Sequence, residues 1–306
     1  MRLGLITDEV SQNLVEALDL AEEFNIRDIE LRSVWGKNVV HLEAAEVAEV
    51  GRLVRQRGMR VVSVAGPVYK CHLHGSGSGQ IGNLHGAPEE LPPEAHMELL
   101  RKTLELAEAW DARFVRTFSF WRATPMPTPE LYQEIAAALR WLLEVVRGSS
   151  RRLLLENEHA CYIGTGAEVE KLWQRGGLEE LGLIWDPGNA FFLGEIPFPN
   201  GYEAVKRGPG MARVLHVHVK DARITGKPTE PYEWAEVGGG EIDYVGQFAA
   251  LAQDGYAGVL SLETHWRPAG GSAKEASRRC LKGMETCLRR AGLRQSPDGE
   301  WVLASG

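Results

Sequence analysis

A short apolar segment followed by a longer amphipathic segment recurs along the whole chain. Residues 2–7, RLGLIT, form such an apolar run, and residues 12–24 then place apolar side chains at the spacing of one helix face. Eight units of this kind follow one another, with apolar runs at 2–7, 27–32, 59–66, 112–119, 151–157, 181–186, 213–221 and 257–264. The helical segments that follow them lie near 12–24, 43–57, 94–110, 129–147, 166–175, 201–207, 243–253 and 273–291.

This alternation predicts the topology of the fold. Strands that alternate with helices form parallel sheets, and eight such units in 306 residues are most simply closed into a barrel. A doubly wound open sheet is the alternative, but no Gly-rich dinucleotide turn follows the first run. We therefore expect an α/β fold, a (β/α)8 barrel that forms a single domain over residues 1–306. The βα loops at 66–93 and 220–240 are long, and we expect them to form a lid or a wall of the active site. The small polar residues of HGSGSGQ at 74–80 predict that the first loop is mobile.

Charge and cysteine content narrow the class of protein. The formal net charge of −8 speaks against non-specific binding to nucleic acid or to an anionic membrane surface, because both require a basic face. A small-molecule partner is expected instead. The four cysteines form no CxxC pair, the start is not signal-like, and no apolar run approaches the roughly 18 residues of a membrane span. These features predict a cytoplasmic protein with free thiols. They do not fix the oligomeric state, and a homo-oligomer is one of the alternatives.

Acidic and imidazole side chains gather where the predicted strands end. Active sites of parallel barrels form at the carboxyl ends of the strands, because the variable loops leave from there. The residues of this kind at these ends are Asp8, Glu30, Glu156, Glu158, Asp186, His216, His218, Glu263 and His265. Carboxylates that converge on one cavity repel one another and are costly to desolvate without a cation. The pattern therefore predicts a divalent metal ion.

The alternation of side chains along a strand selects the ligands. In the fifth strand Glu156 and Glu158 face the axis, with Glu158 higher at the lip, and in the seventh strand His218 lies closer to the active end than His216. One inward ligand from each of the last four strands gives a metal site of Glu156, Asp186, His218 and Glu263. Three carboxylates and one imidazole favour Mn²⁺, Mg²⁺ or Co²⁺, and Zn²⁺ is compatible.

Five motifs carry a resemblance to a known family. LENEH, WDPGNA, HVHVKDAR, VGGGEIDY and SLETHW occur in this order in the second half of the chain, and IELRSVWG lies in the second unit. Together they resemble the xylose-isomerase-like TIM barrel superfamily, in its sugar phosphate isomerase/epimerase branch, over most of the chain. The resemblance implies that the Glu of the EN pair, the Asp of DPGN, the His before x-K-D and the Glu of the last strand bind the metal. These are the same four residues, Glu156, Asp186, His218 and Glu263.

The resemblance also implies an activity. It predicts a metal-dependent isomerase or epimerase that abstracts a proton next to the carbonyl of a sugar, sugar phosphate or polyol ketone. In the family's epimerases two carboxylates on opposite faces remove and return this proton, and Glu156 and Glu263 match them. The residues expected to bind substrate are Glu158, His159, Asn189, Lys220, Arg223 and Arg267. Characterised ketose epimerases commonly have a histidine where Asn189 stands, so the identity of the substrate stays open.

Three other functions compete with this one. A dehydratase of the same superfamily, similar to inosose dehydratase, also begins by removing a proton next to a carbonyl. An AP-endonuclease-like DNA repair enzyme would need more histidine ligands and a basic groove, and a non-catalytic metal-binding barrel would not need two opposed glutamates. The sequence assigns no role to His72, His74, His85 and Glu241.

Overall fold

Eight parallel strands close into a barrel in the computed structural model, which describes residues 1–74, 84–85 and 90–304. The strand order around the barrel is β1-β12-β9-β8-β7-β6-β5-β2. The strands are β1 (Arg2–Ile6), β2 (Asp28–Leu31), β5 (Arg60–Val68), β6 (Phe114–Thr117), β7 (Arg152–Glu156), β8 (Gly182–Trp185), β9 (Val214–Val219) and β12 (Val259–Leu262). The expected (β/α)8 barrel is confirmed.

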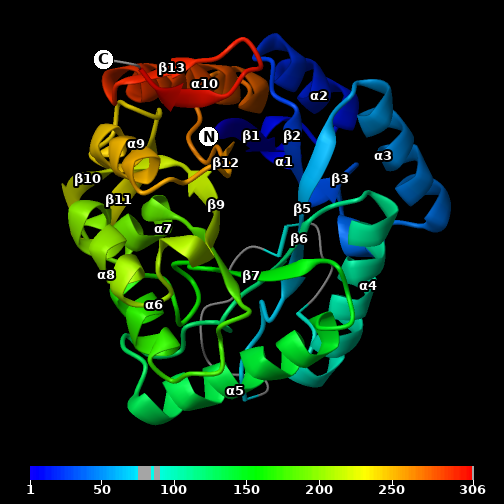
Figure 1. The fold of residues 1–306 in the computed structure, drawn as a ribbon, viewed down its shortest axis with the longest axis vertical. Coiled ribbons are helices and arrows are strands. Elements are labelled where there is room, and N and C mark those ends of the chain that lie inside the picture. Colours follow the sequence, from blue (N-terminus) through cyan, green and yellow to red (C-terminus); the bar gives the residue numbers. More distant parts are fainter. Residues whose placement is uncertain (75–83, 86–89, 305–306) are drawn as a thin grey trace.

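Helices surround the strands as an outer ring (Figure 1). They are α2 (Leu14–Glu23), α3 (Ala44–Gln56), α4 (His96–Ala109), α5 (Pro129–Val146), α6 (Gly166–Trp173), α8 (Tyr202–Arg207), α9 (Tyr244–Gln253) and α10 (Ala273–Arg290). Several of them begin at a polar side chain that accepts a hydrogen bond from the first turn, as Asn13, Thr128, Thr165 and Ser272 do. Such caps explain why these helices start within a residue or two of the positions that the sequence predicts.

Short elements fill the connections. They are α1 (Thr7–Val10), α7 (Pro187–Phe192), β3 (Ser33–Val34), β4 (Lys37–Asn38), β13 (Leu293–Gln295) and β14 (Trp301–Leu303), with 3-10 turns at 39–41, 93–95 and 211–213 and a π-helical turn at 197–201. None of the described helices is long and apolar enough to cross a membrane. All four cysteines are buried free thiols, as expected.

The inside of the barrel changes from apolar to polar along its axis. Phe114, Leu154 and Ile184 form a small cluster of their own, separate from the main core between strands and helices. Leu153 and Leu155 belong to that main core, so neighbours along β7 face opposite sides as the alternation predicts. Because Glu156 follows Leu154 on the inward face, it lies beyond the apolar plug at the carboxyl end of the barrel.

The second of the two long βα loops contains a β-hairpin. Residues 221–235 form an antiparallel hairpin of β10 (Asp221–Lys227) and β11 (Glu230–Ala235). The Asp221 carboxylate accepts hydrogen bonds from the backbone N–H groups of Gly238, Gly240 and Ile242, so the glycine-rich segment after the hairpin is folded around this side chain. Most of the HGSGSGQ segment, for which mobility is predicted, lies outside the described residues.

Candidate metal centre and active site

The four predicted metal ligands converge at the carboxyl ends of β7, β8, β9 and β12. Each is buried, and each offers one ligand atom within 4.8 Å of the others. The Nδ1 atom of His218 lies 3.2 Å from Glu156 Oε1, 3.7 Å from Asp186 Oδ2 and 3.6 Å from Glu263 Oε2. The structure thus places one imidazole nitrogen and three carboxylate oxygens around a single point, and metal binding there stays a prediction.

Asp186 shows how the local fold aims a donor at this point. The residue is the N-cap of α7, and its Oδ1 accepts a hydrogen bond of 2.9 Å from the backbone N–H of Asn189. Its Oδ2 is buried and faces the cluster, with the ammonium of Lys220 at 2.9 Å. Buried carboxylate oxygens are costly unless cations balance their charge, and a metal ion would share that role with Lys220. The donor set therefore fits a divalent ion with oxygen and nitrogen ligands.

A second acidic side chain holds the far side of His218. Glu30 Oε1 lies 3.2 Å from Nε2 of His218 and 2.8 Å from Nε2 of His216. Burial raises the pKa of Glu30, but the two imidazoles outweigh it and hold the pKa well below its usual range. His216 thus has a buried polar partner beneath the cluster, and Glu30 links both histidines.

Basic side chains that the sequence analysis did not select also reach the site. Arg116 Nη1 lies 2.8 Å from Glu156 Oε2, and Arg32 Nη1 lies 2.8 Å from Glu263 Oε1. Arg32 also binds Asp8, at 3.0 Å, and forms an ion pair with Glu9. The alternation along the strands is the signal that could have found both arginines, because Arg32 shares its parity with Glu30 and Arg116 shares its parity with Phe114.

These cations correct one step of the sequence argument. We expected that only a metal ion would let the carboxylates coexist, whereas arginine and lysine side chains balance part of the charge. Lys220 Nζ lies 2.5 Å from Glu263 Oε2 and 2.9 Å from Asp186 Oδ2. Burial lowers the pKa of Lys220, but Asp186 and Glu263 outweigh it and raise the pKa above its usual range. Lys220 is therefore an ammonium inside the cluster.

Three of the predicted substrate-binding residues form a connected wall. The His159 Nδ1 and Asn189 Oδ1 atoms are 2.8 Å apart, and Asn189 Nδ2 lies 3.4 Å from Glu156 Oε1. Glu158 lies 3.2 Å from His159 and 3.9 Å from the buried ammonium of Lys70. The wall thus continues from a predicted metal ligand to the lip of the barrel.

The two predicted arginines lie farther out. Arg267 is at the rim, with Nη2 3.3 Å from Glu9 Oε2 and Nη1 donating to the carbonyl oxygen of Thr264. Arg223 lies on β10, where it forms an ion pair of 2.6 Å with Glu233 across the hairpin, and both side chains are about half exposed. The structure does not bring Arg223 to the cluster.

A cavity of about 410 Å³ opens beside the cluster. Its lining combines charged, polar and aromatic side chains: Asp8, Glu9, Gln12, Arg32, Ser33, His85, Trp234 and His265. Trp234 reaches it from β11, stacks on Phe192 at 3.9 Å between ring centroids and meets the His265 ring at 4.7 Å. Trp234 was not predicted from the sequence, although Tyr232 and Trp234 flank Glu233 with the spacing of two residues on one face of a strand. The volume suits a small polar ligand.

The comparison with protein families agrees with this architecture. Residues 18–284 match the model of the xylose isomerase-like TIM barrel family. The chain belongs to that family. The resemblance of the five motifs to the xylose isomerase-like TIM barrel superfamily is thereby confirmed.

Individual relatives of this family member are distant. An inosose dehydratase of Clostridium tetani (strain Massachusetts / E88) is 24% identical over 163 residues, which cover 49% of this chain and 53% of the relative. The chain thus spans about half the length of the curated relatives it matches. Among solved structures, the IOLI protein with a binding zinc atom superposes with a TM-score of 0.70 at 16% identity, covering 95% of this chain and 98% of that one. An L-ribulose 3-epimerase gives 0.65 at 18% identity, with 95% and 96% covered. These two likenesses establish the fold.

Proposed function

We propose that this family member is a divalent-metal-dependent isomerase or epimerase that removes a proton next to the carbonyl of a sugar, sugar phosphate or polyol ketone. We call Glu156, Asp186, His218 and Glu263 the donor cluster. The observation that carries the proposal is the placement of Glu156 and Glu263 on two sides of this cluster. Glu156 ends β7 and Glu263 follows β12, and β8 and β9 separate these strands in the barrel. The two carboxylates therefore approach a substrate at the cluster from different directions.

Both carboxylates have the charge that a general base requires. Burial raises the pKa of Glu156, but His218 and Arg116 outweigh it and lower the pKa to about 2. Burial also raises the pKa of Glu263, and Lys220 together with His265 holds it well below its usual range. An ionised carboxylate on each side can remove a proton from one face of a carbon and return one to the other face.

The predicted ligands would hold the metal ion, with Mn²⁺, Mg²⁺ or Co²⁺ preferred by this oxygen-rich set and Zn²⁺ supported by the zinc atom of the IOLI protein. When bound, such an ion polarises the carbonyl and stabilises negative charge on the enediolate oxygens. Lys220, as an ammonium between Asp186 and Glu263, would donate a hydrogen bond to a substrate oxygen at the same point.

The remaining substrate contacts follow from the wall and the cavity. Glu158, His159 and Asn189 present hydrogen-bonding groups beside Glu156, and they would fix hydroxyl groups of the substrate. Arg267 would act at the rim. Arg223 remains a proposed contact only for a substrate that reaches the hairpin, because its guanidinium pairs with Glu233.

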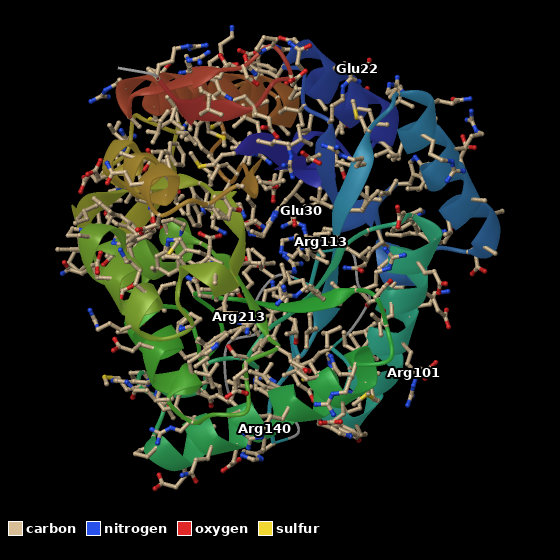
Figure 2. The ribbon with its side chains drawn as sticks, viewed as in Figure 1. Glu22, Glu30, Arg101, Arg113, Arg140 and Arg213 are labelled. Atoms are coloured by element: carbon tan, nitrogen blue, oxygen red, sulfur yellow. The ribbon has the colours of Figure 1, made fainter. Side chains whose placement is uncertain are left out.

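Hydrogen exchange with deuterated water tests the proposal. Metal-loaded protein is incubated with a panel of ketoses and inososes, and NMR follows deuterium at the carbon next to the carbonyl. An epimerase places solvent deuterium at the inverted carbon, and Glu263→Gln should block turnover while still permitting exchange on the Glu156 side. Glu22→Gln, on an outer helix far from the barrel axis (Figure 2), is the matched control and should behave as the parent protein. Failure of every compound to exchange would contradict the proposal.

A dehydratase is the second candidate, and the similarity to an inosose dehydratase favours it. Such an enzyme uses the same first proton abstraction and then protonates a hydroxyl group that leaves as water. The same NMR experiment separates the two, because a dehydratase forms an unsaturated or deoxy product and no epimer. Irreversible loss of water from the best substrate would replace the isomerase assignment, and the four predicted metal ligands would serve either reaction.

A further inference from the structure

An arginine lies at the amino-terminal end of most barrel strands. These ends surround the opening of the barrel opposite the donor cluster. The arginine is the first residue of the strand or the residue just before it: Arg2 for β1, Arg27 for β2, Arg60 for β5, Arg113 for β6, Arg152 for β7 and Arg213 for β9. The chain as a whole carries a net charge of −8, so this accumulation of positive charge does not follow from composition.

Half of these arginines have protein partners. Arg2 and Arg60 both bind the buried carboxylate of Asp28, at 2.8 and 2.9 Å, and Arg27 donates to the carbonyl oxygen of Arg57. The other three differ. In the part of the chain that the structure describes, Arg113, Arg152 and Arg213 form no ion pair and no side-chain hydrogen bond, and Arg113 only covers the Phe114 ring at 5.3 Å.

We call Arg113, Arg152 and Arg213 the arginine cluster. The backbone N–H of Arg152 donates to the carbonyl oxygen of Arg113 over 3.0 Å, which fixes these two residues side by side at the start of β7 and β6. Burial lowers the pKa of Arg152, and the positive charges of Arg213 and Arg113 lower it further. Figure 2 shows Arg113 and Arg213 near the barrel axis, whereas Arg101 and Arg140 lie on outer helices. Positive charges on neighbouring strand ends, with no carboxylate of the described residues paired to them, favour an anion between them.

Two hollows of about 480 Å³ each are lined in part by Arg113 of the arginine cluster. They share Arg2, Val62 and Arg113 in their linings, so they meet at Arg113, while Arg152 and Arg213 belong to neither lining. One of them is also lined by Phe114, Met211 and Tyr256, which offer apolar surface beside the guanidinium groups. A volume of this size accepts a small organic molecule.

We propose that this opening of the barrel binds a small phosphorylated metabolite, with its phosphate oxygens between Arg113, Arg152 and Arg213 and its organic part in the hollow beside Phe114, Met211 and Tyr256. The planar guanidinium forks match phosphate oxygens with paired hydrogen bonds, which a lysine could not reproduce. The site lies at the opposite end of the barrel from the donor cluster, so it is independent of the proposed catalytic function.

Calorimetric titration of the full chain at low ionic strength tests the proposal. The probes are tripolyphosphate, AMP, adenosine, inorganic phosphate and citrate. Tripolyphosphate and AMP should bind one site per chain, AMP more tightly than inorganic phosphate and adenosine not detectably. Arg113→Gln and Arg213→Gln should each weaken the binding of AMP by about tenfold or more, because each removes charged hydrogen bonds. Arg113→Lys should weaken it less than Arg113→Gln does.

Arg101→Gln is the matched control. Arg101 is exposed on α4 and pairs with Glu98 at 3.1 Å, so its replacement removes the same charge without touching the hollows. Equal weakening by Arg101→Gln would show that only net charge matters and would overturn the proposal. Citrate binding tighter than every phosphate, or phosphate affinities unchanged in Arg113→Gln, Arg113→Lys and Arg213→Gln, would also overturn it. Circular dichroism and melting temperature establish that each variant is folded before titration.

Discussion

The carboxylate of Glu30 lies 3.2 Å from Nε2 of His218, on the side of the ring that faces away from Glu156. When Nε2–H donates to Glu30, Nδ1 is the nitrogen left to bind a cation, and it points at the cluster of carboxylates. The orientation of the only imidazole among the four predicted ligands is therefore set by a residue from β2, on the far side of the barrel from β8.

This contact leads to a prediction about metal affinity. Glu30→Gln keeps the shape of the side chain but removes the charge that holds the Nε2–H form of His218. Loss of such an outer contact typically weakens metal binding about 10- to 100-fold. Competition titration of Mn²⁺ or Co²⁺ against a chelator measures the change, and the visible spectrum of the Co²⁺ protein reports any altered geometry. An affinity equal to that of the Glu22→Gln control would show that Glu30 does not orient the ligand.

Removal of the metal should lower the melting temperature. A metal present at a hundredfold excess over its dissociation constant stabilises the folded state by about 2.7 kcal/mol. For a chain of this size such a change corresponds to several degrees. Differential scanning calorimetry before and after chelation, with metal content checked by elemental analysis, gives the shift. Re-addition of Mn²⁺ should restore it, and an unchanged melting temperature in demonstrably metal-depleted protein would argue against the four-ligand site.

Replacement of Glu156 and replacement of Glu158, at the end of β7, should affect different kinetic properties. Glu156→Gln keeps one oxygen at the cluster but removes the base and leaves Arg116 without its carboxylate, so deuterium exchange should fall by about 10² to 10⁴ while metal content falls only in part. Glu158→Gln, whose native side chain touches His159, should mainly raise KM. Steady-state kinetics and metal analysis of both variants make the comparison. If Glu158→Gln were the inactive variant, the two roles would be reversed.

His96 gives a prediction about acid stability away from the site. Its Nδ1 accepts a hydrogen bond of 2.7 Å from the Tyr69 backbone N–H, and Nε2 lies 3.1 Å from the Leu91 carbonyl oxygen, so the folded state holds the neutral ring. Burial lowers the pKa of His96 to about 4. Because the folded pKa lies below the unfolded one, this contribution is present above about pH 6.5 and is lost as the pH falls toward 4.

The variant His96→Asn isolates this effect, since its side-chain oxygen can accept from the same N–H without titrating. Urea unfolding should show the parent protein losing up to about 3 kcal/mol more than the variant between pH 7 and pH 4. A difference between the two proteins that stays constant over this range would contradict the assignment.

The periodicity of the chain was sufficient to predict the barrel and the inward face of its strands. Leu154 and Glu156 alternate with Leu153 and Leu155, and one face of β7 must then lie inside a closed parallel barrel. The convergence of Glu156, Asp186, His218 and Glu263 follows from the same rule, because each lies at the carboxyl end of its strand.

Pairings between distant side chains were not predictable in this way. Arg32 lies 231 positions from Glu263 in the sequence, and Arg116 lies 40 positions from Glu156, so no local pattern connects them. The outward position of Arg223 depends on the register of the β10–β11 hairpin, in which Arg223 lies opposite Glu233. That register is fixed only once the segment folds back on itself, and it also places Trp234 over the cavity.

The hairpin separates two properties of the site. It begins at Asp221, directly after Lys220, and its two strands bond to each other rather than to the barrel. Trp234, which lines the cavity, therefore belongs to a segment outside the barrel sheet. The length and sequence of this segment can vary without breaking any hydrogen bond between barrel strands. The donor cluster, by contrast, is built into the barrel strands and their immediate ends. Evolution or protein engineering can thus exchange the hairpin that covers the cavity while keeping the four predicted metal ligands unchanged.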